Sequence, residues 1–126
     1  MNACAIIEHE SGGLYLSVTR KTDHTDFGFP GGAYDPDEDM DLIDTALRET
    51  AEETGMNVEI LAMFEPFIED DCYTFFGRTT LIPNDEISKS ETGKVEFVSR
   101  EVLENQSSFG DYNKRAFQHF KNLGVI

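Results

Sequence analysis

The chain has 126 residues, of which 25 are acidic and 10 are basic, and its formal net charge is −15. A field of this sign repels nucleic-acid backbones and anionic membranes, so neither is an expected partner. No run reaches the roughly 20 apolar residues of a membrane helix, and the N-terminus becomes acidic too early for a signal peptide. We therefore expect one globular domain over residues 1–126, located in the cytoplasm.

The N-terminal part is expected to contain two strands followed by an irregular segment. Residues 3–8 and 14–20 carry strand patterns and are joined by a glycine turn. Lys21–Asp26 is predicted to be a polar loop, and Phe27–Gly32 contains too much glycine and proline to continue a strand. An acidic turn over residues 35–41 follows.

The remainder is expected to mix helices and strands. A helical pattern runs from about residue 41 to residue 54, and Gly55 is expected to end it. Residues 58–68 and 72–82 are predicted to form a strand pair, with a loop over residues 83–93. A short strand and two helices complete the prediction, over residues 94–98, 100–105 and 112–122. This order favours an α+β or three-layer arrangement.

The two cysteines, Cys4 and Cys72, lie beside apolar or aromatic residues in expected strands. Two cysteines make no disulfide framework, and their spacing does not match a zinc site. We expect both to be buried, reduced thiols.

Three glutamates share one face of the central helix. At about 100° per residue, Glu52 lies about 60° to one side of Glu49, and Glu53 lies about 40° to the other. Like charges at these spacings repel, and they sit near the helix C-terminus, where negative charge is unfavourable. A bound cation would compensate both effects, and oxygen ligands suit Mg²⁺ or Mn²⁺. A solvated glutamate-rich face is the alternative interpretation.

The segment Phe29-Pro30-Gly31-Gly32 precedes this helix. Its glycines allow a tight turn and a close approach, so that main-chain atoms can reach a metal or a phosphate group. An ordinary turn is the alternative for a lone pair of glycines. Followed by a glutamate-rich helix, the pair is much more specific for such a site, with Gly32 and Phe29 as candidate substrate contacts.

These residues together resemble the Nudix box, G-x5-E-x7-R-E-U-x-E-E-x-G-U, in which U is a bulky aliphatic residue. The matching positions are Gly32, Glu38 and the run RETAEETGM that begins at Arg48. Two departures stand out. Nine residues separate Glu38 from Arg48 where the family has seven, and Thr50 occupies an aliphatic position. The two-residue insertion leaves the role of Glu38 open and the helix unchanged.

The resemblance implies the Nudix fold, an α/β/α sandwich with a mixed central sheet between helices. It also implies two or more Mg²⁺ or Mn²⁺ ions, held by Glu49, Glu52, Glu53 and the main-chain carbonyl of Gly31. These three glutamates would be catalytic, with Glu49 either a ligand or a partner of the attacking water. Arg48 would act by pairing with a nearby carboxylate and orienting it.

Two further residues are implied by likeness to MutT-type members. Glu96-Phe97 matches a glutamate–aromatic pair in a late strand, which makes Glu91, five residues earlier, a candidate metal ligand or general base. Asp85 and Glu86 are alternatives in the same loop. The segment from Phe109 to Asn113 resembles the part that faces the base, and the Asn113 amide could both donate to and accept from a purine edge.

The resemblance therefore implies hydrolysis of a diphosphate linkage in a nucleotide, with attack at phosphorus and Glu91 or Glu53 accepting the proton of water. Conversion of a (deoxy)nucleoside triphosphate, including oxidised purine nucleotides, to monophosphate and pyrophosphate is favoured. ADP-ribose or another nucleoside diphosphate sugar, and a dinucleoside polyphosphate, are alternative substrates. A non-catalytic nucleotide-binding Nudix domain is a third hypothesis. A monomer or a homodimer is expected.

Overall fold

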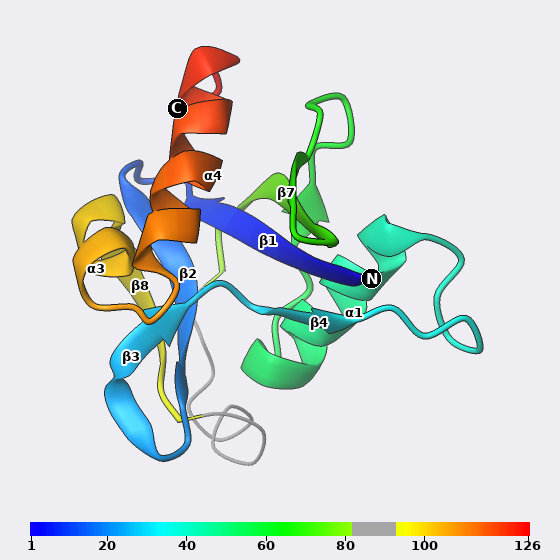
Figure 1. The fold of residues 1–126 in the computed structure, drawn as a ribbon, viewed down its shortest axis with the longest axis horizontal. Helices are drawn as coiled ribbons and strands as arrows, with labels where there is room; N and C mark the ends of the chain where they lie inside the picture. The colour runs from blue at the N-terminus through cyan, green and yellow to red at the C-terminus, as the bar shows by residue number, and fades with distance from the viewer. Residues whose placement is uncertain (82–92) are drawn as a thin grey trace.

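The computed structural model describes residues 1–81 and 93–126. The strands are β1 (Asn2–His9), β2 (Leu14–Arg20), β3 (Asp23–Gly28), β4 (Gly31–Ala33), β5 (Glu59–Ile60), β6 (Phe67–Glu69), β7 (Cys72–Thr79) and β8 (Val95–Ser99). The helices are α1 (Leu42–Thr54), α3 (Arg100–Asn105) and α4 (Gly110–Asn122). Figure 1 shows their arrangement.

The described strands form a mixed sheet in the order β3-β2-β1-β7-β5. Strand β4 pairs with β1, β6 pairs with β7, and β8 pairs with β2. The central pair β1–β7 is parallel, whereas its neighbours are antiparallel. A parallel pair needs a long crossover connection, and helix α1 lies within that connection.

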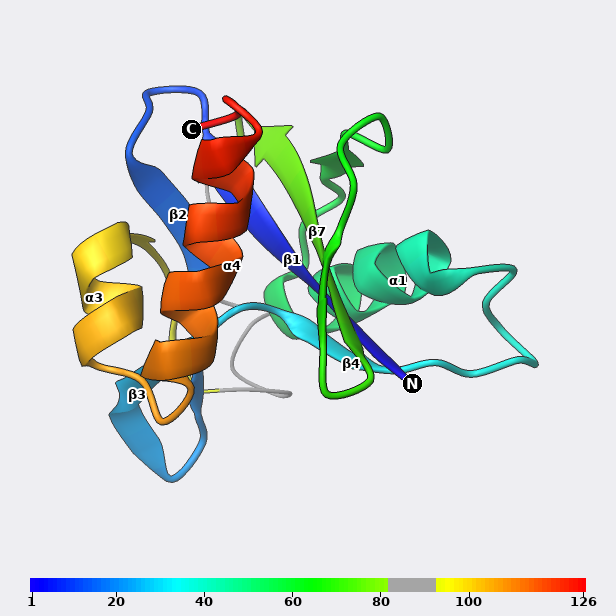
Figure 2. The same cartoon turned by 45° about the horizontal axis from the view of Figure 1, so that its top comes forward.

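Helices cover both faces of the sheet, with α1 on one side and α3 and α4 on the other (Figure 2). Because successive strand residues point to opposite faces, neighbours in β1 and β7 enter different cores. Ile6 and Phe76 pack with the residues of α3 and α4, while Ile7 and Phe75 pack with Ala46 of α1. The expected α/β/α sandwich with a mixed sheet is confirmed.

Helix α1 follows its sequence prediction closely. The Asp41 side chain accepts a hydrogen bond from the Asp44 main-chain N–H and caps the N-terminus. Gly55 ends the helix with a φ of 71°, in the left-handed region that glycine adopts without strain. Since both ends are fixed locally, the position of each glutamate on the helix is fixed as well.

Three expectations about the strands were wrong. Lys21–Asp26 is not a loop, because β3 begins at Asp23 and forms a hairpin with β2 that tolerates polar residues at the exposed edge. Phe27–Gly32 also contributes to strands at both of its ends, in β3 and β4. The expected strand over residues 58–68 is divided into β5 and β6 by a turn in which the Phe64 N–H donates to the Leu61 carbonyl.

Two smaller expectations also need correction. Helix α4 begins at Gly110, two residues before the expected start. Cys4 and Cys72 are free thiols as expected, but both are only partly buried. Among the described residues, no helix is both long enough and apolar enough to cross a bilayer.

The core beneath α4 provides a test of the fold. Phe117 is fully buried, and its ring meets those of Tyr15 and Phe29 edge to face, with centroids 4.9 and 5.5 Å away. Phe117→Ala should lower the free energy of unfolding in urea by about 3–5 kcal/mol, and Phe117→Leu should cost less. Equal and negligible losses in both variants would contradict this packing.

Candidate active site

Arg48 links the glutamates of helix α1. Its Nη1 donates to Glu49 Oε1 at 3.1 Å and to Glu52 Oε1 at 3.3 Å. Its Nη2 donates to the Ala33 carbonyl at 3.1 Å, which ties the helix to the end of β4. The guanidinium group therefore provides positive charge beside two neighbouring carboxylates and joins the helix to the glycine segment.

Glu49 and Glu53 form a second contact on the same face. Their carboxyl groups lie close enough together that each affects the pKa of the other. Burial, followed by the charge of Glu49, raises the pKa of Glu53 to about 8. Burial, followed by the charge of Glu52, also raises the pKa of Glu49. The carboxylates of this face therefore repel one another in a partly buried position, and a divalent cation would relieve that repulsion.

The two glycines of β4 allow the main chain to lie directly against these carboxylates. A Cβ atom on Gly32 would lie 2.5 Å from the carboxyl carbon of Glu49. A Cβ atom on Gly31 would lie 2.3 Å from the Cβ of Cys4, and the Gly31 main chain also hydrogen-bonds to Glu53. A side chain at Gly32 would therefore push β4 away from Glu49 of α1, whereas a side chain at Gly31 would push β4 away from β1.

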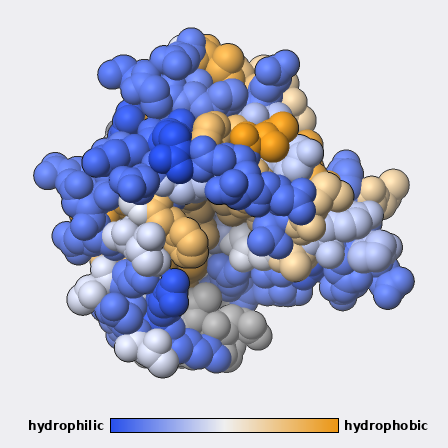
Figure 3. Space-filling view, in the orientation of Figure 1, coloured by the Kyte–Doolittle hydropathy of each residue, from blue (hydrophilic) through white to orange (hydrophobic). Residues whose placement is uncertain are grey.

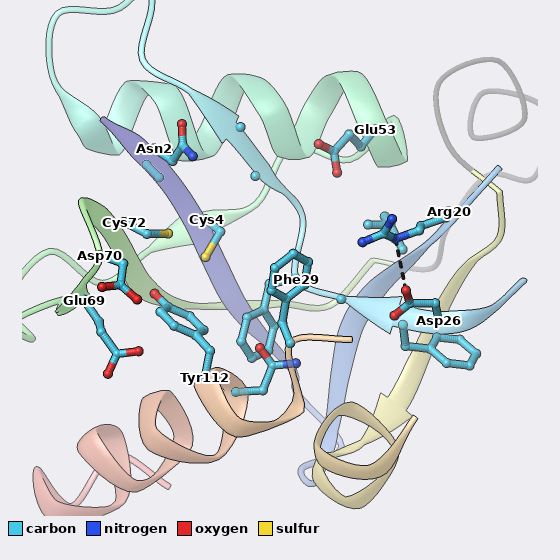
Figure 4. Close-up of a pocket in the computed structure, with 18 of the residues that line it drawn as sticks. Asn2, Cys4, Arg20, Asp26, Phe29, Glu53, Glu69, Asp70, Cys72 and Tyr112 are labelled. Atoms are coloured by element: carbon cyan, nitrogen blue, oxygen red, sulfur yellow. Dashed lines mark ion pairs between the residues drawn. The ribbon is translucent and has the colours of Figure 1, made fainter. Parts of the chain in front are cut away.

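A cleft of about 570 Å³ opens beside this face. Phe29 lies in the middle of the view in Figure 4, with Glu53 and Arg20 to one side and Cys72 and Asp70 to the other. The surface over this part of the molecule is hollowed, with apolar residues between hydrophilic rims (Figure 3). The cleft thus joins an acidic wall to an apolar interior, an arrangement typical of small-molecule sites.

The two sides of the cleft differ in chemistry. On one side, Arg20 Nε pairs with Asp26 Oδ2 at 3.0 Å, and the arginine side chain is 58% exposed. On the other side, Thr74 Oγ1 hydrogen-bonds to both the Cys4 thiol and the Tyr112 hydroxyl. The Cys4 thiol donates a hydrogen bond to Cys72, and this bond, followed by burial, raises the pKa of Cys4 and keeps that thiol protonated.

The structure brings most of the expected site residues together. Arg48, Glu49, Glu52, Glu53, Gly31 and Gly32 meet along the contact between α1 and β4. Phe29 and Asn113 line the cleft beside them. The Asn113 amide nitrogen donates to the Leu103 carbonyl at 2.9 Å and to Ser107, so it is used within the protein. Its role in reading a base stays a prediction. Glu91, with its alternatives Asp85 and Glu86, lies outside the described residues.

The described carboxylates do not form a preorganised metal site. Within residues 1–81 and 93–126, no three acidic, imidazole or thiol groups are arranged to hold an ion. Nη1 of Arg48 is shared by Glu49 and Glu52 instead. Oxygen ligands of this kind and density suit a hard divalent ion, so the residues fit the metal that the motif implies.

Sequence reasoning missed several residues of the site. Asp39 is the principal partner of Arg48, yet it lies among alternating aspartates that the sequence cannot rank. Arg20 and Asp26 face the cleft, although Asp26 was placed in an expected loop. Tyr112 belonged to the segment expected to face a base, and only its neighbour Asn113 was selected.

The fold and this site define the class of protein, a hydrolase built on the Nudix scaffold. A model of the NUDIX domain matches residues 1–120, so the chain belongs to the Nudix family. The expected family and the assignment to Nudix-type hydrolases are thereby confirmed. No curated protein matches the chain.

Solved structures share the fold at low sequence identity. A Caenorhabditis elegans Ap4A hydrolase in a binary complex has a TM-score of 0.75 and 16% identity, over 100% of both chains. A MutT protein from Methanosarcina mazei Go1 has a TM-score of 0.67 and 24% identity, over 95% of this chain and 94% of that one. The NUDIX domain of Shewanella oneidensis NrtR, complexed with ADP ribose, has a TM-score of 0.65 and 21% identity, over 97% and 86%.

The close contact at Gly32 can be tested by adding a single methyl group. Gly32→Ala should displace the Glu49 carboxylate and weaken Mn²⁺ binding, measured by titration calorimetry, by about tenfold or more. Gly28→Ala is the matched control, because a Cβ atom there meets nothing within 4 Å. Equal Mn²⁺ affinity in the two variants would exclude the proposed packing of β4 against α1.

The raised pKa of Glu53 predicts how stability depends on pH. Between its ordinary pKa of 4.5 and about 8, the folded chain keeps a proton that the unfolded chain releases. The free energy of unfolding of the metal-free protein should therefore fall as pH rises through this window. Glu53→Gln should flatten the slope measured by urea unfolding, whereas Glu101→Gln, an exposed control, should not. An unchanged slope in Glu53→Gln would refute the assignment.

Proposed function

We propose that the protein is a divalent-metal-dependent pyrophosphohydrolase that cleaves a diphosphate linkage in a nucleotide. The observation that carries this proposal is the Glu49–Glu53 carboxyl pair, which lies against the Gly31–Gly32 main chain at the wall of a cleft. The cleft is large enough for a nucleotide and has both polar and apolar walls. Together with the family, this supports a polyphosphate held at α1 and a nucleoside held in the cleft.

The glutamates of α1 would serve as the metal ligands. Glu49, Glu52 and Glu53, with the carbonyl of Gly31, would hold Mg²⁺ or Mn²⁺ ions, two or more in number. Bound ions supply charge neutralisation of the phosphates and lower the pKa of a coordinated water. Glu53 suits the role of proton acceptor, because its pKa lies near neutrality and it faces the cleft. Glu91 is the second candidate for that role.

The remaining cleft residues would bind the rest of the substrate. Arg20 is the exposed cation on the same side as Glu53, and it would contact a phosphate oxygen by exchanging part of its pairing with Asp26. Phe29 and Tyr112 offer aromatic surface to a base, and Asn113 would read its edge. Gly32 would let the phosphate chain approach the main chain.

A (deoxy)nucleoside triphosphate, including an oxidised purine nucleotide, is the proposed first substrate, with monophosphate and pyrophosphate as products. The similar fold of an Ap4A hydrolase supports a dinucleoside polyphosphate as an alternative. The fold of a NUDIX domain complexed with ADP ribose supports a nucleoside diphosphate sugar, or binding without hydrolysis. The protein is proposed to act in the cytoplasm as a monomer or homodimer.

A substrate panel tests these proposals together. Phosphate and pyrophosphate release should be measured for nucleoside triphosphates, oxidised purine nucleotides, ADP-ribose and dinucleoside polyphosphates, with Mg²⁺ and then with EDTA. Isotopically labelled water should place its oxygen in the monophosphate if the α-phosphorus is attacked and in pyrophosphate if the β-phosphorus is attacked, and either result would establish attack at phosphorus. Glu52→Gln and Glu53→Gln should each lower kcat by about 10²-fold or more.

The Glu101→Gln variant serves as the control for this panel, since that residue lies on α3 and is exposed. Activity that survives EDTA, or undiminished activity in Glu53→Gln, would contradict the proposed function. Nucleotide binding without hydrolysis across the whole panel would favour the non-catalytic alternative.

A further inference from the structure

Asp39 is the most completely bonded acidic side chain near the proposed site. Its side chain is only 1% exposed, although it lies in an otherwise exposed acidic loop. Its two oxygens accept from Arg48 Nε at 2.9 Å and from Arg48 Nη2 at 3.0 Å. This two-point contact fixes the plane of the guanidinium group as well as its position.

The surrounding loop is built to hold the Asp39 carboxylate. Oδ2 of Asp39 also accepts from the Thr45 hydroxyl at 2.8 Å and from the Asp35 main-chain N–H at 3.0 Å. The Asp39 main-chain N–H donates to the Asp35 carbonyl at 2.7 Å. The hydrogen bond from the Arg48 guanidinium is the main reason that the pKa of Asp39 lies well below its usual range. The carboxylate is therefore a charged anchor inside a closed turn.

Glu38, the residue that the motif would select, is a poor anchor. It approaches Arg48 only at 3.5 Å and its side chain is 57% exposed. In this chain Asp39, and not the glutamate at the motif position, therefore holds Arg48. Since an aspartate has a shorter side chain than a glutamate, the loop must bring its backbone closer to Arg48, and the internal bonds to Asp35 and Thr45 do so.

We propose that Asp39 is a positioning residue that holds Arg48 at the rim of the metal-binding face, so that the guanidinium orients Glu49 and Glu52 without replacing the cation. The hydrogen bonds of the Arg48 guanidinium group support this proposal. Nε and Nη2 are bound to Asp39, and Nη2 also binds Ala33, which leaves Nη1 alone to reach the glutamates. Without the anchor, the whole guanidinium group could turn toward Glu49 and Glu52 and compete with a divalent ion. This inference rests on the proposed metal-dependent function.

The test is Mn²⁺ binding to the purified protein without nucleotide, measured by electron paramagnetic resonance well below the melting temperature. Asp39→Asn should weaken Mn²⁺ affinity by about tenfold or more. Thr45→Val, which removes one hydrogen bond to Asp39 and no charge, should show a smaller loss. Asp37→Asn is the matched control, because it removes the same charge from an exposed position in the same loop. Glu38→Gln should resemble this control.

A double-mutant cycle separates positioning from folding. In an Arg48→Gln background, Asp39→Asn should cause no further loss of Mn²⁺ affinity, because Asp39 then has nothing to position. Asp39→Asn should instead raise the melting temperature of the Arg48→Gln protein, because Arg48→Gln alone leaves a buried carboxylate without its cation. If the losses of Mn²⁺ affinity in the two single variants add in full in the double variant, the proposal is wrong.

Two other outcomes also decide the matter. Wild-type Mn²⁺ affinity in folded Asp39→Asn would overturn the proposal, and so would a larger loss in Glu38→Gln than in Asp39→Asn. If the wild-type protein binds Mn²⁺ but hydrolyses no nucleotide, the proposed function is wrong. The ratio of Mn²⁺ affinities between the wild-type protein and Asp39→Asn then still decides the role of Asp39.

Discussion

The repulsion between the carboxylates of α1 is the constraint around which this site is organised. Burial and the charge of Glu49 raise the pKa of Glu53, and Glu49 and Glu52 share the Nη1 group of Arg48. One corner of a guanidinium group is a weak substitute for a divalent ion, because it contacts only two of the three carboxylates.

The position of this face depends on the parallel pairing of β1 with β7. That pairing requires a long crossover, which carries α1 across one face of the sheet while α4 covers the other. Strand β4 then pairs with β1, and its glycines lie against α1. The cleft therefore has residues from α1, α4, β1 and β4 in its walls.

Local signals in the sequence predicted much of this arrangement. Asp41 and Gly55 define the ends of α1, so the glutamates of the helix could be placed on one face correctly. The strand β3 was missed because an exposed edge strand shows no apolar alternation, and the short β4 because its glycines resemble a turn. Asp39 was missed for a different reason. The loop buries the side chain of Asp39, whereas the neighbouring aspartates are exposed or only partly buried, and the sequence alone does not show this difference.

The net charge of −15 is then best understood together with the site. Such a protein repels every polyanion at long range, nucleotides included. If the protein binds a nucleotide as proposed, that binding would depend on cations that the protein collects first or that arrive with the nucleotide. Arg20 and Arg48 do not change this balance, since Asp26 pairs with the first and Asp39 with the second. Because both arginines are paired with aspartates, the proposed binding of a polyphosphate would depend on divalent metal more than on fixed positive charge.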